Sequence, residues 1–544
     1  MIELTRKKRY LLSLLSGVLM IVSFPFTGSI TPLVFVSWIP LLLVENSISA
    51  KKYRSSKVLI HALIVFIGYN IGSTWWIWNA DEAGAIMAFL LNGLIMALVF
   101  FLFHTLKKRF KTKWGYALLP ILWIGFEFLH YNWELSYPWL NLGNVFSIFP
   151  MFVQWYSLTG VLGGTLWVLI VNLLIFFLLK NRFEKAPNLK YQKQLAILVL
   201  IFLVIPISAS IYSYYSYNER INPVEIVAVQ PNIDPYNEKF GIAEQSQNNQ
   251  LDKIYSLADK MVTPNTKFVL APETSIWQSF FEEDLKSQPF YQYTIGRKKI
   301  WGAVDLLIGA STFRFFKNKN SDVSRKLDSG PGFYESYNSS LLVNSKNRPF
   351  IIHKSKLVLG VEKVPFISYI PWLEKLVIEK GGASGTLGIE SEPKVMVSNN
   401  TIFAPCICYE SIYGDFVSKQ VKKGAELILI ITNDGWWGDT PGYKQHCSFA
   451  RLRAIENRRS VARSANTAIS CFINQRGDVI KETKWWTEDV IRGELNKNTQ
   501  MTFYSLHGDW LGKLFLYISC SLLIYELIKR ISRLFPKKCK IKST

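Results

Sequence analysis

Long apolar runs alternate with short polar segments through the first part of the chain. Seven runs that can cross a bilayer, about 20 residues each, precede residue 220: 10–26, 30–46, 58–78, 84–105, 115–131, 152–179 and 194–216. One more run lies at 511–529, and the sequence between 220 and 508 contains none. The pattern predicts seven membrane spans, a large domain outside the membrane and an eighth span.

The large domain shows a different pattern of short runs rich in β-branched residues. They lie at 224–229, 268–271, 306–308, 341–343, 350–352, 402–407 and 427–432. Such short continuous runs are typical of buried strands. Three of them lead within two residues to the ionisable residues Glu273, Lys354 and Cys408. Because sites in layered α/β folds form where strands end, these residues are the first candidates for a functional site.

Basic residues are unevenly distributed over the connections between the apolar runs. Twenty-five of them lie in the N-terminal tail, the connections 51–57, 107–113 and 180–193, and the tail from Lys529. The alternate connections, 27–29, 79–83 and 132–151, hold no Lys or Arg. Since basic residues favour the cytoplasmic side, we expect both termini to be cytoplasmic and the large domain to lie outside. The basic head Arg6–Arg9 also fits a cleaved signal peptide, but no clear small-residue cleavage site follows it.

Composition supports a membrane protein and argues against a nucleic-acid partner. Hydrophobic residues make up 49% of the 544 residues and charged residues 19%, whereas a soluble domain carries about 25% charge. The net charge of +22 would suggest nucleic acid in a soluble protein. Without the 25 basic residues of the cytoplasmic connections, however, the remaining 37 nearly balance the 40 acidic residues.

The cysteine and histidine spacings give no sign of a metal site or a disulfide framework. The six cysteines do not form paired C-x-x-C motifs, and the six histidines include no H-E-x-x-H motif. The sequence also lacks a phosphate-binding loop and a G-x-S-x-G elbow. We therefore expect no metal site.

Cys408, Glu273 and Lys354 together suggest nucleophilic catalysis. An unassisted thiol is only about 3% thiolate at pH 7, so a nucleophilic Cys408 needs a base or the N-terminus of a following helix. Glu273 is a candidate base, because an apolar pocket raises the pKa of a carboxyl toward the useful range. Lys354 is a candidate for stabilising an oxyanion. Taken singly, each residue is more often structural, as a buried thiol or a salt-bridge partner.

The motifs around these residues resemble those of the carbon–nitrogen hydrolase (nitrilase) superfamily. They are P-E-T at 272–274, H-K-S-K-L-V-L-G-V-E at 353–362, C-Y-E at 408–410 and N-D-G-W-W-G at 433–438. With Y-P-W-L-N-L-G at 137–143 and the predicted spans, the whole chain resembles the apolipoprotein N-acyltransferase family. The resemblance implies an α-helical bundle of eight spans and an αββα sandwich on the outer side. The expected divisions are 1–220, 221–508 and 509–544.

The resemblance also implies a reaction. A phospholipid donates an acyl chain to Cys408, and the chain then passes to the N-terminal amine of an S-diacylglyceryl-cysteine lipoprotein. Glu273 would act as the base and Lys354 as the oxyanion partner, without a cofactor. Glu362, Tyr409 and Glu410 match supporting family positions, although Glu362 alone would be assigned to a pair with Lys363 or Lys356. The implied protein is monomeric and lies in a bacterial inner membrane, with its catalytic domain in the periplasm.

Two further segments bear on lipid access. The segment 364–378 is apolar, aromatic and interrupted by proline, so it is either an arm above the site or an ordinary packed helix, and the glycines of 381–385 would form its hinge. Near Gln230, a tryptophan common in the family is replaced by Lys239-Phe240. The tryptophans at the outer ends of the spans, including Trp76 and Trp139, favour an interfacial belt, with a lipid head-group site as the alternative.

Two other functions remain open from the residues. A membrane-tethered amidase or nitrilase acting on a small amide would use the same Glu273, Lys354 and Cys408, but seven spans exceed what a tether requires. A transporter with an outer binding domain usually carries ionisable residues within its spans. Here we note Glu127, His61 and His104 in or near span interiors.

Overall fold

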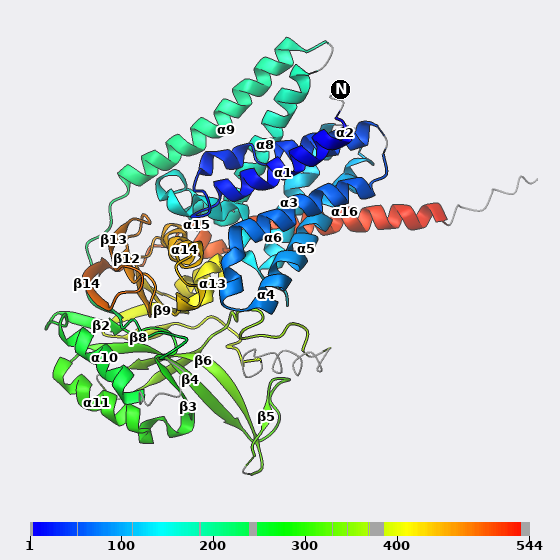
Figure 1. Cartoon of the computed structure of the whole chain (residues 1–544). Coiled ribbons are helices and arrows are strands. Elements are labelled where there is room, and N and C mark those ends of the chain that lie inside the picture. Colours follow the sequence, from blue (N-terminus) through cyan, green and yellow to red (C-terminus); the bar gives the residue numbers. More distant parts are fainter. Residues whose placement is uncertain are drawn as a thin grey trace, which may run out of the picture.

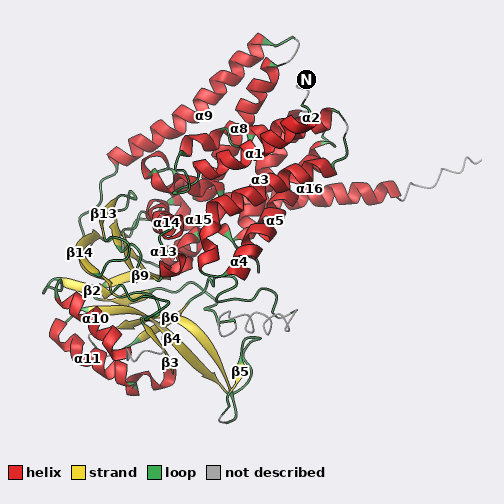
Figure 2. Cartoon of the chain, in the orientation of Figure 1, coloured by secondary structure: helices red, strands yellow, loops and turns green. Residues whose placement is uncertain are grey.

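The chain folds into a helical bundle and a domain of two sheets. A computed structural model describes residues 4–51, 53–110, 113–183, 186–238, 247–328, 330–344, 346, 348–367, 369 and 386–534. In Figure 1 the blue and cyan helices gather on one side of the molecule, and the red helix α16 (Trp510–Leu534) runs among them. Figure 2 shows the yellow strands on the other side.

The bundle is built from the apolar runs of the sequence. Its main helices are α1 (Arg6–Ser23), α2 (Ile39–Ala50), α3 (Ser56–Thr74), α4 (Glu82–Met87), α5 (Gly93–Lys107), α6 (Leu118–His130), α8 (Val161–Arg182) and α9 (Leu189–Ser216). Short 3-10 helices connect them: η1 (Thr31–Phe35), η2 (Trp75–Asn79), η4 (Lys113–Ala117), η5 (Pro138–Leu140), η6 (Leu142–Ile148) and η7 (Pro150–Phe152). A π-helical turn, η3 (Ala88–Asn92), and a short helix, α7 (Tyr156–Thr159), complete the bundle.

Six of the described helices, rather than eight, are long and apolar enough to cross a membrane. They are Thr31–Ala50, Ser56–Asn79, Glu82–Lys107, Val161–Arg182, Leu189–Ser216 and Trp510–Ser532. The other two predicted runs are also helical. However, α1 begins with the basic residues Arg6–Arg9, and the apolar helix Gly115–His130 is shorter than the others. The eight-span prediction is therefore not established by the helices themselves.

Aromatic side chains fill the middle of the bundle. Trp38 and Trp123 are fully buried, and their ring centroids lie 4.5 Å apart in an edge-on arrangement. By contrast, α9 buries only Leu195 and Ser210, while Leu200 and Ile205 on the same helix are exposed. An apolar helix with so little protein contact is suited to a lipid environment.

The second part of the chain contains two sheets. The strand order of the first is β14-β1-β2-β4-β6-β5, with β3 beside β4 and β7 beside β6. Its strands are β1 (Pro223–Gln230), β2 (Thr266–Leu270), β3 (Ile276–Phe281), β4 (Asp305–Phe316), β5 (Arg325–Lys326), β6 (Phe333–Val343), β7 (Phe350–His353) and β14 (Asp489–Asn496). The second has the order β13-β12-β11-β10-β9-β8. Its strands are β8 (Met396–Ser398), β9 (Thr401–Ile407), β10 (Leu427–Thr432), β11 (Val461–Ala465), β12 (Cys471–Ile473) and β13 (Val479–Glu482).

Both faces of the central strands are buried, which explains their continuous apolar sequences. In β10, Leu429 and Ile431 face the core between the two sheets. Ile428 and Ile430, on the opposite face, belong to the large core that also includes the membrane bundle. The alternation follows from the two-residue period of a strand and places the second sheet directly beside the bundle.

Helices cover the outer faces of both sheets, giving four layers as expected for an αββα sandwich. α10 (Gln247–Asp259) and α11 (Pro289–Trp301) share a core with the first sheet. α13 (Gly414–Lys422) and α14 (Pro441–Asn457) pack between the second sheet and the membrane bundle. The remaining short elements are η8 (Glu282–Ser287), η9 (Cys408–Ile412), η10 (Asp434–Trp437) and α15 (Phe503–His507).

Candidate active site

The three candidate catalytic residues each follow a strand. Cys408 comes directly after β9, Lys354 directly after β7, and Glu273 follows β2 after Ala271 and Pro272. Each strand carries its chain from the interior of a sheet to the same end of the sandwich, so the three side chains meet there. All three are buried, with exposed fractions of 8%, 1% and 6%.

A buried ion-pair group forms around Lys354. Its Nζ lies 3.0 Å from Oε1 of Glu273 and 2.8 Å from Oε1 of Glu362. Glu362 therefore does not pair with Lys363 or Lys356. Its other oxygen accepts a hydrogen bond from the backbone N–H of Val358 at 2.8 Å, while Lys363 pairs with Glu134. One ammonium group thus holds two carboxylates in fixed positions.

Asn338, which the sequence reasoning missed, completes this group. Its Nδ2 donates to Oε1 of both Glu273 and Glu362 at 2.8 Å, and its backbone carbonyl accepts from the backbone N–H of Lys354 at 2.7 Å. Asn338 lies within the buried strand β6. An amide in the middle of a buried strand is the signal that would have identified it, because buried polar groups need specific partners.

The backbone around Glu273 is tightly constrained. The N–H of Asn433 donates to Oε2 of Glu273 at 3.1 Å. Thr274 has a φ of 50°, and Gly309 of β4 packs so closely that a Cβ there would lie 2.5 Å from Cα of Glu273. Only glycine permits this approach, so the carboxylate is held from both its side chain and its backbone.

The charges determine the protonation of the lysine and the thiol at rest. Burial alone would lower the pKa of Lys354, but the carboxylates of Glu273 and Glu362 outweigh it and hold that pKa well above its usual range. Burial, reinforced by Glu273, raises the pKa of the Cys408 thiol well above its usual range, and Lys354 only partly opposes this. At neutral pH the site therefore contains an ammonium group and a neutral thiol.

The expected helical support for a thiolate is absent at Cys408. Cys408 is the first residue of the short 3-10 turn η9, and the next α-helix, α13, begins only at Gly414. Cys408 itself has a φ of 49°, a left-handed conformation that costs about 1 kcal/mol or more outside glycine. The turn thus presents the thiol from a strained backbone position. Without a helix N-terminus to stabilise a thiolate, the candidate base Glu273 must remove the thiol proton.

Glu410 joins the cysteine and lysine segments. Its Oε2 accepts from the backbone N–H of Ile407 at 2.8 Å, and its Oε1 accepts from that of Ser355 at 2.6 Å. Burial raises the pKa of Glu410 to about 7, although these two backbone hydrogen bonds oppose the rise. Glu410 is therefore a structural link between the two catalytic segments.

Tyr409 turns toward the membrane bundle. Its ring stacks on Trp139 with a centroid distance of 6.5 Å and lies edge-on to Tyr413 at 5.3 Å. Trp139 is buried, and its Nε1 donates to Gln445 of α14. Tyr409 thus connects the nucleophile's turn to the aromatic side chains at the ends of the membrane helices.

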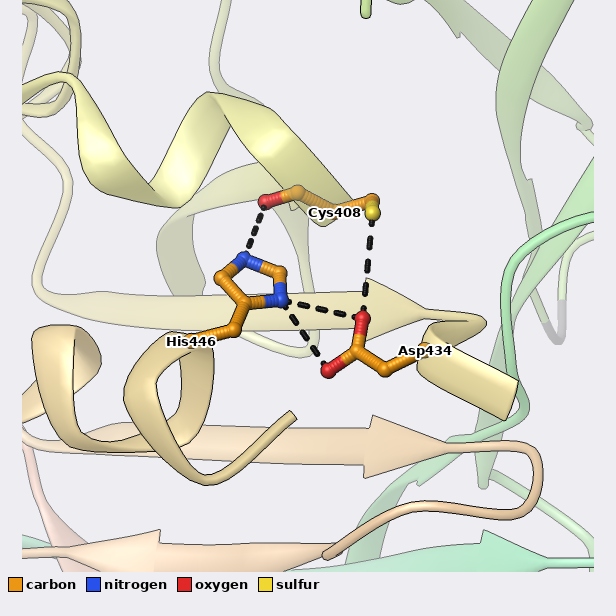
Figure 3. A group of neighbouring side chains, drawn as sticks. All are labelled: Cys408, Asp434 and His446. Carbon is orange, nitrogen blue, oxygen red and sulfur yellow. Dashed lines mark hydrogen bonds and ion pairs between the residues drawn. The ribbon is translucent and has the colours of Figure 1, made fainter. Parts of the chain in front are cut away.

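A second polar group lies beside Cys408. The sequence reasoning had named only the motif at 433–438 that contains Asp434. Figure 3 shows Cys408, Asp434 and His446, with the carboxylate of Asp434 between the thiol and the imidazole. Sγ of Cys408 is 3.9 Å from Oδ1 of Asp434, and Nδ1 of His446 is 2.9 Å from the same oxygen. These are residue types that bind metals. However, the guanidinium of Arg463 already pairs with Asp434, so a protein cation neutralises this carboxylate.

A pocket leads from the thiol into the membrane bundle. Cys408 and Tyr409 line one part of it, and the loop residues Val358, Leu359 and Val361 line another. Most of its remaining wall is apolar and comes from η2, α4, η3 and α5: Trp76, Ile77, Met87, Ala88, Leu91 and Ile95. Trp76 and Trp139 are therefore pocket residues, whereas Trp75 and Trp78 are exposed as expected for an interfacial belt.

The segments expected to regulate lipid access are only partly described. In the proposed arm 364–378, the structure describes 364–367 and 369, and the hinge 381–385 and Lys239-Phe240 lie outside the described residues. At the start of the arm, the N–H of Phe366 donates to Glu134 at 3.3 Å. This contact joins the start of the arm to the loop after α6.

Comparison with known proteins identifies the protein family to which this fold and site belong. Residues 228–502 match the carbon-nitrogen hydrolase model, and residues 16–174 match the apolipoprotein N-acyltransferase N-terminal domain. The chain therefore belongs to the carbon–nitrogen hydrolase family, among those members that carry this membrane domain.

Curated relatives are similar over almost their whole length. The chain is 28% identical to the apolipoprotein N-acyltransferase of Chlorobaculum tepidum over 534 residues, covering 96% of this chain and 97% of that protein. It is 27% identical to that of Geobacter metallireducens, with 92% of each chain covered. Identity to the Pasteurella multocida protein is 25%, again with 92% of each covered. The similarity thus includes both the bundle and the sandwich.

Proposed function

We propose that the protein is a phospholipid-dependent N-acyltransferase that completes the acylation of bacterial lipoproteins. The observation that carries this proposal is the apolar pocket that joins Cys408 to the membrane helices. A lipid ester leaves the bilayer only at a cost of about 0.8 kcal/mol per CH₂. A nucleophile at the end of a pocket within the bundle meets its substrate without that cost. The full-length similarity to named N-acyltransferases supports the same reaction.

The first half-reaction forms a thioester. Glu273 takes the proton of the Cys408 thiol while sulfur attacks the carbonyl carbon of the phospholipid's sn-1 ester. Lys354 stabilises the resulting oxyanion, and Glu273 returns the proton to the departing alcohol of the lysophospholipid. Because the thiol is neutral at rest, proton removal and attack must occur together.

The second half-reaction forms an amide. The N-terminal amine of an S-diacylglyceryl-cysteine attacks the thioester, and Lys354 again stabilises the oxyanion. Glu273 takes a proton from the amine, and the departing sulfur is reprotonated as Cys408 is regenerated. Thioester to amide is downhill, so the reaction requires neither ATP nor a cofactor. Glu362 and Asn338 hold Lys354 in place, and Glu410 and Tyr409 hold the turn of Cys408.

The proposed arrangement in the membrane follows the positive-inside rule. We propose eight spans, with 1–220 containing seven, 221–508 forming a periplasmic catalytic domain and 509–544 containing the eighth span and a cytoplasmic tail. The division of the 25 basic residues supports cytoplasmic termini in an inner membrane. The shorter helix Gly115–His130 and α1 would be the two spans beyond the six long apolar helices. The proposed active unit is a monomer.

The acceptor distinguishes this proposal from the alternative of a small-amide hydrolase. Purified protein in detergent is incubated with phosphatidylethanolamine and a synthetic S-diacylglyceryl-cysteine peptide, and the peptide is analysed by mass spectrometry. We expect the peptide to gain one fatty-acyl group on its amine. A matched peptide with an acetylated amine should remain unchanged. If small amides are hydrolysed while the lipidated amine is never acylated, the hydrolase is the correct assignment.

A further inference from the structure

A cluster of three ionisable residues, which the proposed reaction does not use, lies beside the nucleophile Cys408. Asp434 of η10, His446 of α14 and Arg463 of β11 are each completely buried, with exposed fractions of 0%. They come from three separate elements and meet behind Cys408. Buried charges are costly unless they are paired, so their position beside a reactive thiol calls for a functional reason.

Asp434 is held as a carboxylate by its neighbours. Its Oδ1 accepts from Oγ1 of Thr432 at 2.6 Å and lies 2.9 Å from Nδ1 of His446, while Oδ2 pairs with the guanidinium of Arg463. Burial alone would raise the pKa of Asp434, but His446 and Arg463 lower it to about 2. A full negative charge therefore lies 3.9 Å from Sγ of Cys408.

The same group also holds the backbone of the nucleophile. Nε2 of His446 lies 3.2 Å from the carbonyl oxygen of Cys408 and 3.0 Å from Oγ of Ser411. Ser411 in turn donates to that carbonyl at 2.8 Å. His446 and Ser411 therefore hold the backbone carbonyl of Cys408. Asp434 contacts the sulfur of the same residue.

We propose that Asp434, balanced by Arg463 and His446, is a positioning residue that accepts the hydrogen of Cys408 and keeps the nucleophile a neutral thiol until the acyl donor is bound. The charged groups that act on this thiol are Glu273, Lys354, Asp434 and Arg463. His446 acts through Asp434. Because a negative charge beside sulfur disfavours the thiolate, Asp434 raises the pH at which the free thiol becomes reactive.

This inference rests on the proposed role of Cys408, but its test reads the thiol directly. Full-length protein in detergent is treated with iodoacetamide across a pH series, and modification of Cys408 is quantified by mass spectrometry. Asp434→Asn removes the negative charge and should lower the pH midpoint of modification by about one unit, a roughly tenfold faster reaction near neutral pH. Arg463→Met removes the balancing positive charge and should raise the midpoint.

Opposite shifts separate a charge effect from a purely structural one. If both single variants shift the midpoint in the same direction, or neither shifts it, the proposal is wrong. Each single variant leaves a buried charge unpaired, so the double variant Asp434→Asn with Arg463→Met serves as the folded reference. Its midpoint should lie between those of Asp434→Asn and the unchanged protein, since Asp434 is the group nearer the sulfur. A folded double variant with an unchanged midpoint also overturns the proposal.

Discussion

Lys354 joins the two carboxylates of the site and faces the developing oxyanion in the proposed reaction. It pairs with Glu273 and Glu362, and Asn338 bonds both of these carboxylates. Removing the ammonium group therefore has two effects. The oxyanion loses its charged partner, and two buried carboxylates are left close together without a cation.

Lys354→Met should lower the rate of thioester formation by about 10²–10³-fold, or roughly 3–4 kcal/mol, as for loss of other oxyanion donors. Single-turnover acylation of Cys408 by phospholipid measures this directly. Lys419→Met is the matched control, because the side chain of Lys419 is 56% exposed and pairs with Asp415 outside the site. A Lys354→Met protein that acylates at the rate of the control would rule out the assigned role.

At the residue scale, the sequence predicted those site residues that lie at strand ends within recognisable motifs. Glu273, Lys354 and Cys408 each follow an apolar run, and Glu362 and Glu410 lie within the same motifs. Asn338 and Arg463 were missed because each lies inside a buried strand, where local pattern predicts packing. Their partners are distant in sequence and become neighbours only when two sheets and a helix converge.

At the scale of elements, Glu410 fastens the turn after β9 to the segment after β7. Its carboxyl has an ordinary pKa of 4.5 that burial raises to about 7 in the folded protein. The folded state therefore retains a proton that the unfolded chain has released. This contribution to stability is fully present below pH 4.5 and is lost as the pH rises through 7, by about 3 kcal/mol in total.

Glu410→Gln should accordingly flatten the dependence of thermal stability on pH. We expect the melting temperature of the unchanged protein in detergent to fall between pH 5 and pH 8 (roughly the window of this titration), and that of Glu410→Gln to fall less. Glu392→Gln, at an exposed carboxyl paired with Lys423, should keep the full slope. The interpretation fails if Glu410→Gln keeps the same slope as this control.

The close approach of β4 to the Glu273 segment gives a second test at this scale. In Gly309→Ala the new Cβ would meet backbone atoms of Glu273 and Thr274 at 2.5 Å or less. We expect a loss of about 1–3 kcal/mol in stability and, because Glu273 is displaced, up to about 10²-fold in activity. Thermal melting and acylation rates measure the two effects.

Gly296→Ala is the matched control for that substitution. Gly296 lies in the helix α11, and a Cβ there would have no neighbour within 4 Å. Alanine should therefore stabilise the helix by up to about 1 kcal/mol and leave activity unchanged. Equal effects of the two substitutions would contradict the packing account of Glu273.

At the scale of the whole molecule, the bundle and the sandwich form one functional unit. The core beside the second sheet continues into the membrane bundle, and the pocket has walls from both parts. The apolar pattern predicted the helices and the two kinds of architecture. It could not predict which residues line the pocket, because that depends on how η2, η3 and the turn of Cys408 meet in space.

Leu91→Trp tests whether the pocket holds the acyl chain. Leu91 lines the pocket, whereas its neighbour Leu90 is 52% exposed. Filling the pocket should slow thioester formation from long-chain phospholipids by roughly 10–100-fold, the equivalent of about 1–3 kcal/mol of overpacking. Iodoacetamide labelling of Cys408 should not change. Leu90→Trp should behave as the unchanged protein, and a similar loss in both variants would argue against a pocket for the chain.

The central claim is that Cys408 carries the acyl group between two lipid substrates. The most direct measurement is a mass spectrum of the peptide containing Cys406 and Cys408 after incubation of the protein with phosphatidylethanolamine. We predict one fatty-acyl adduct on Cys408, present in Cys406→Ser, absent in Cys408→Ser, and discharged by an S-diacylglyceryl-cysteine peptide but only slowly by water. A folded protein whose Cys408 stays unmodified with every phospholipid tested would contradict the account.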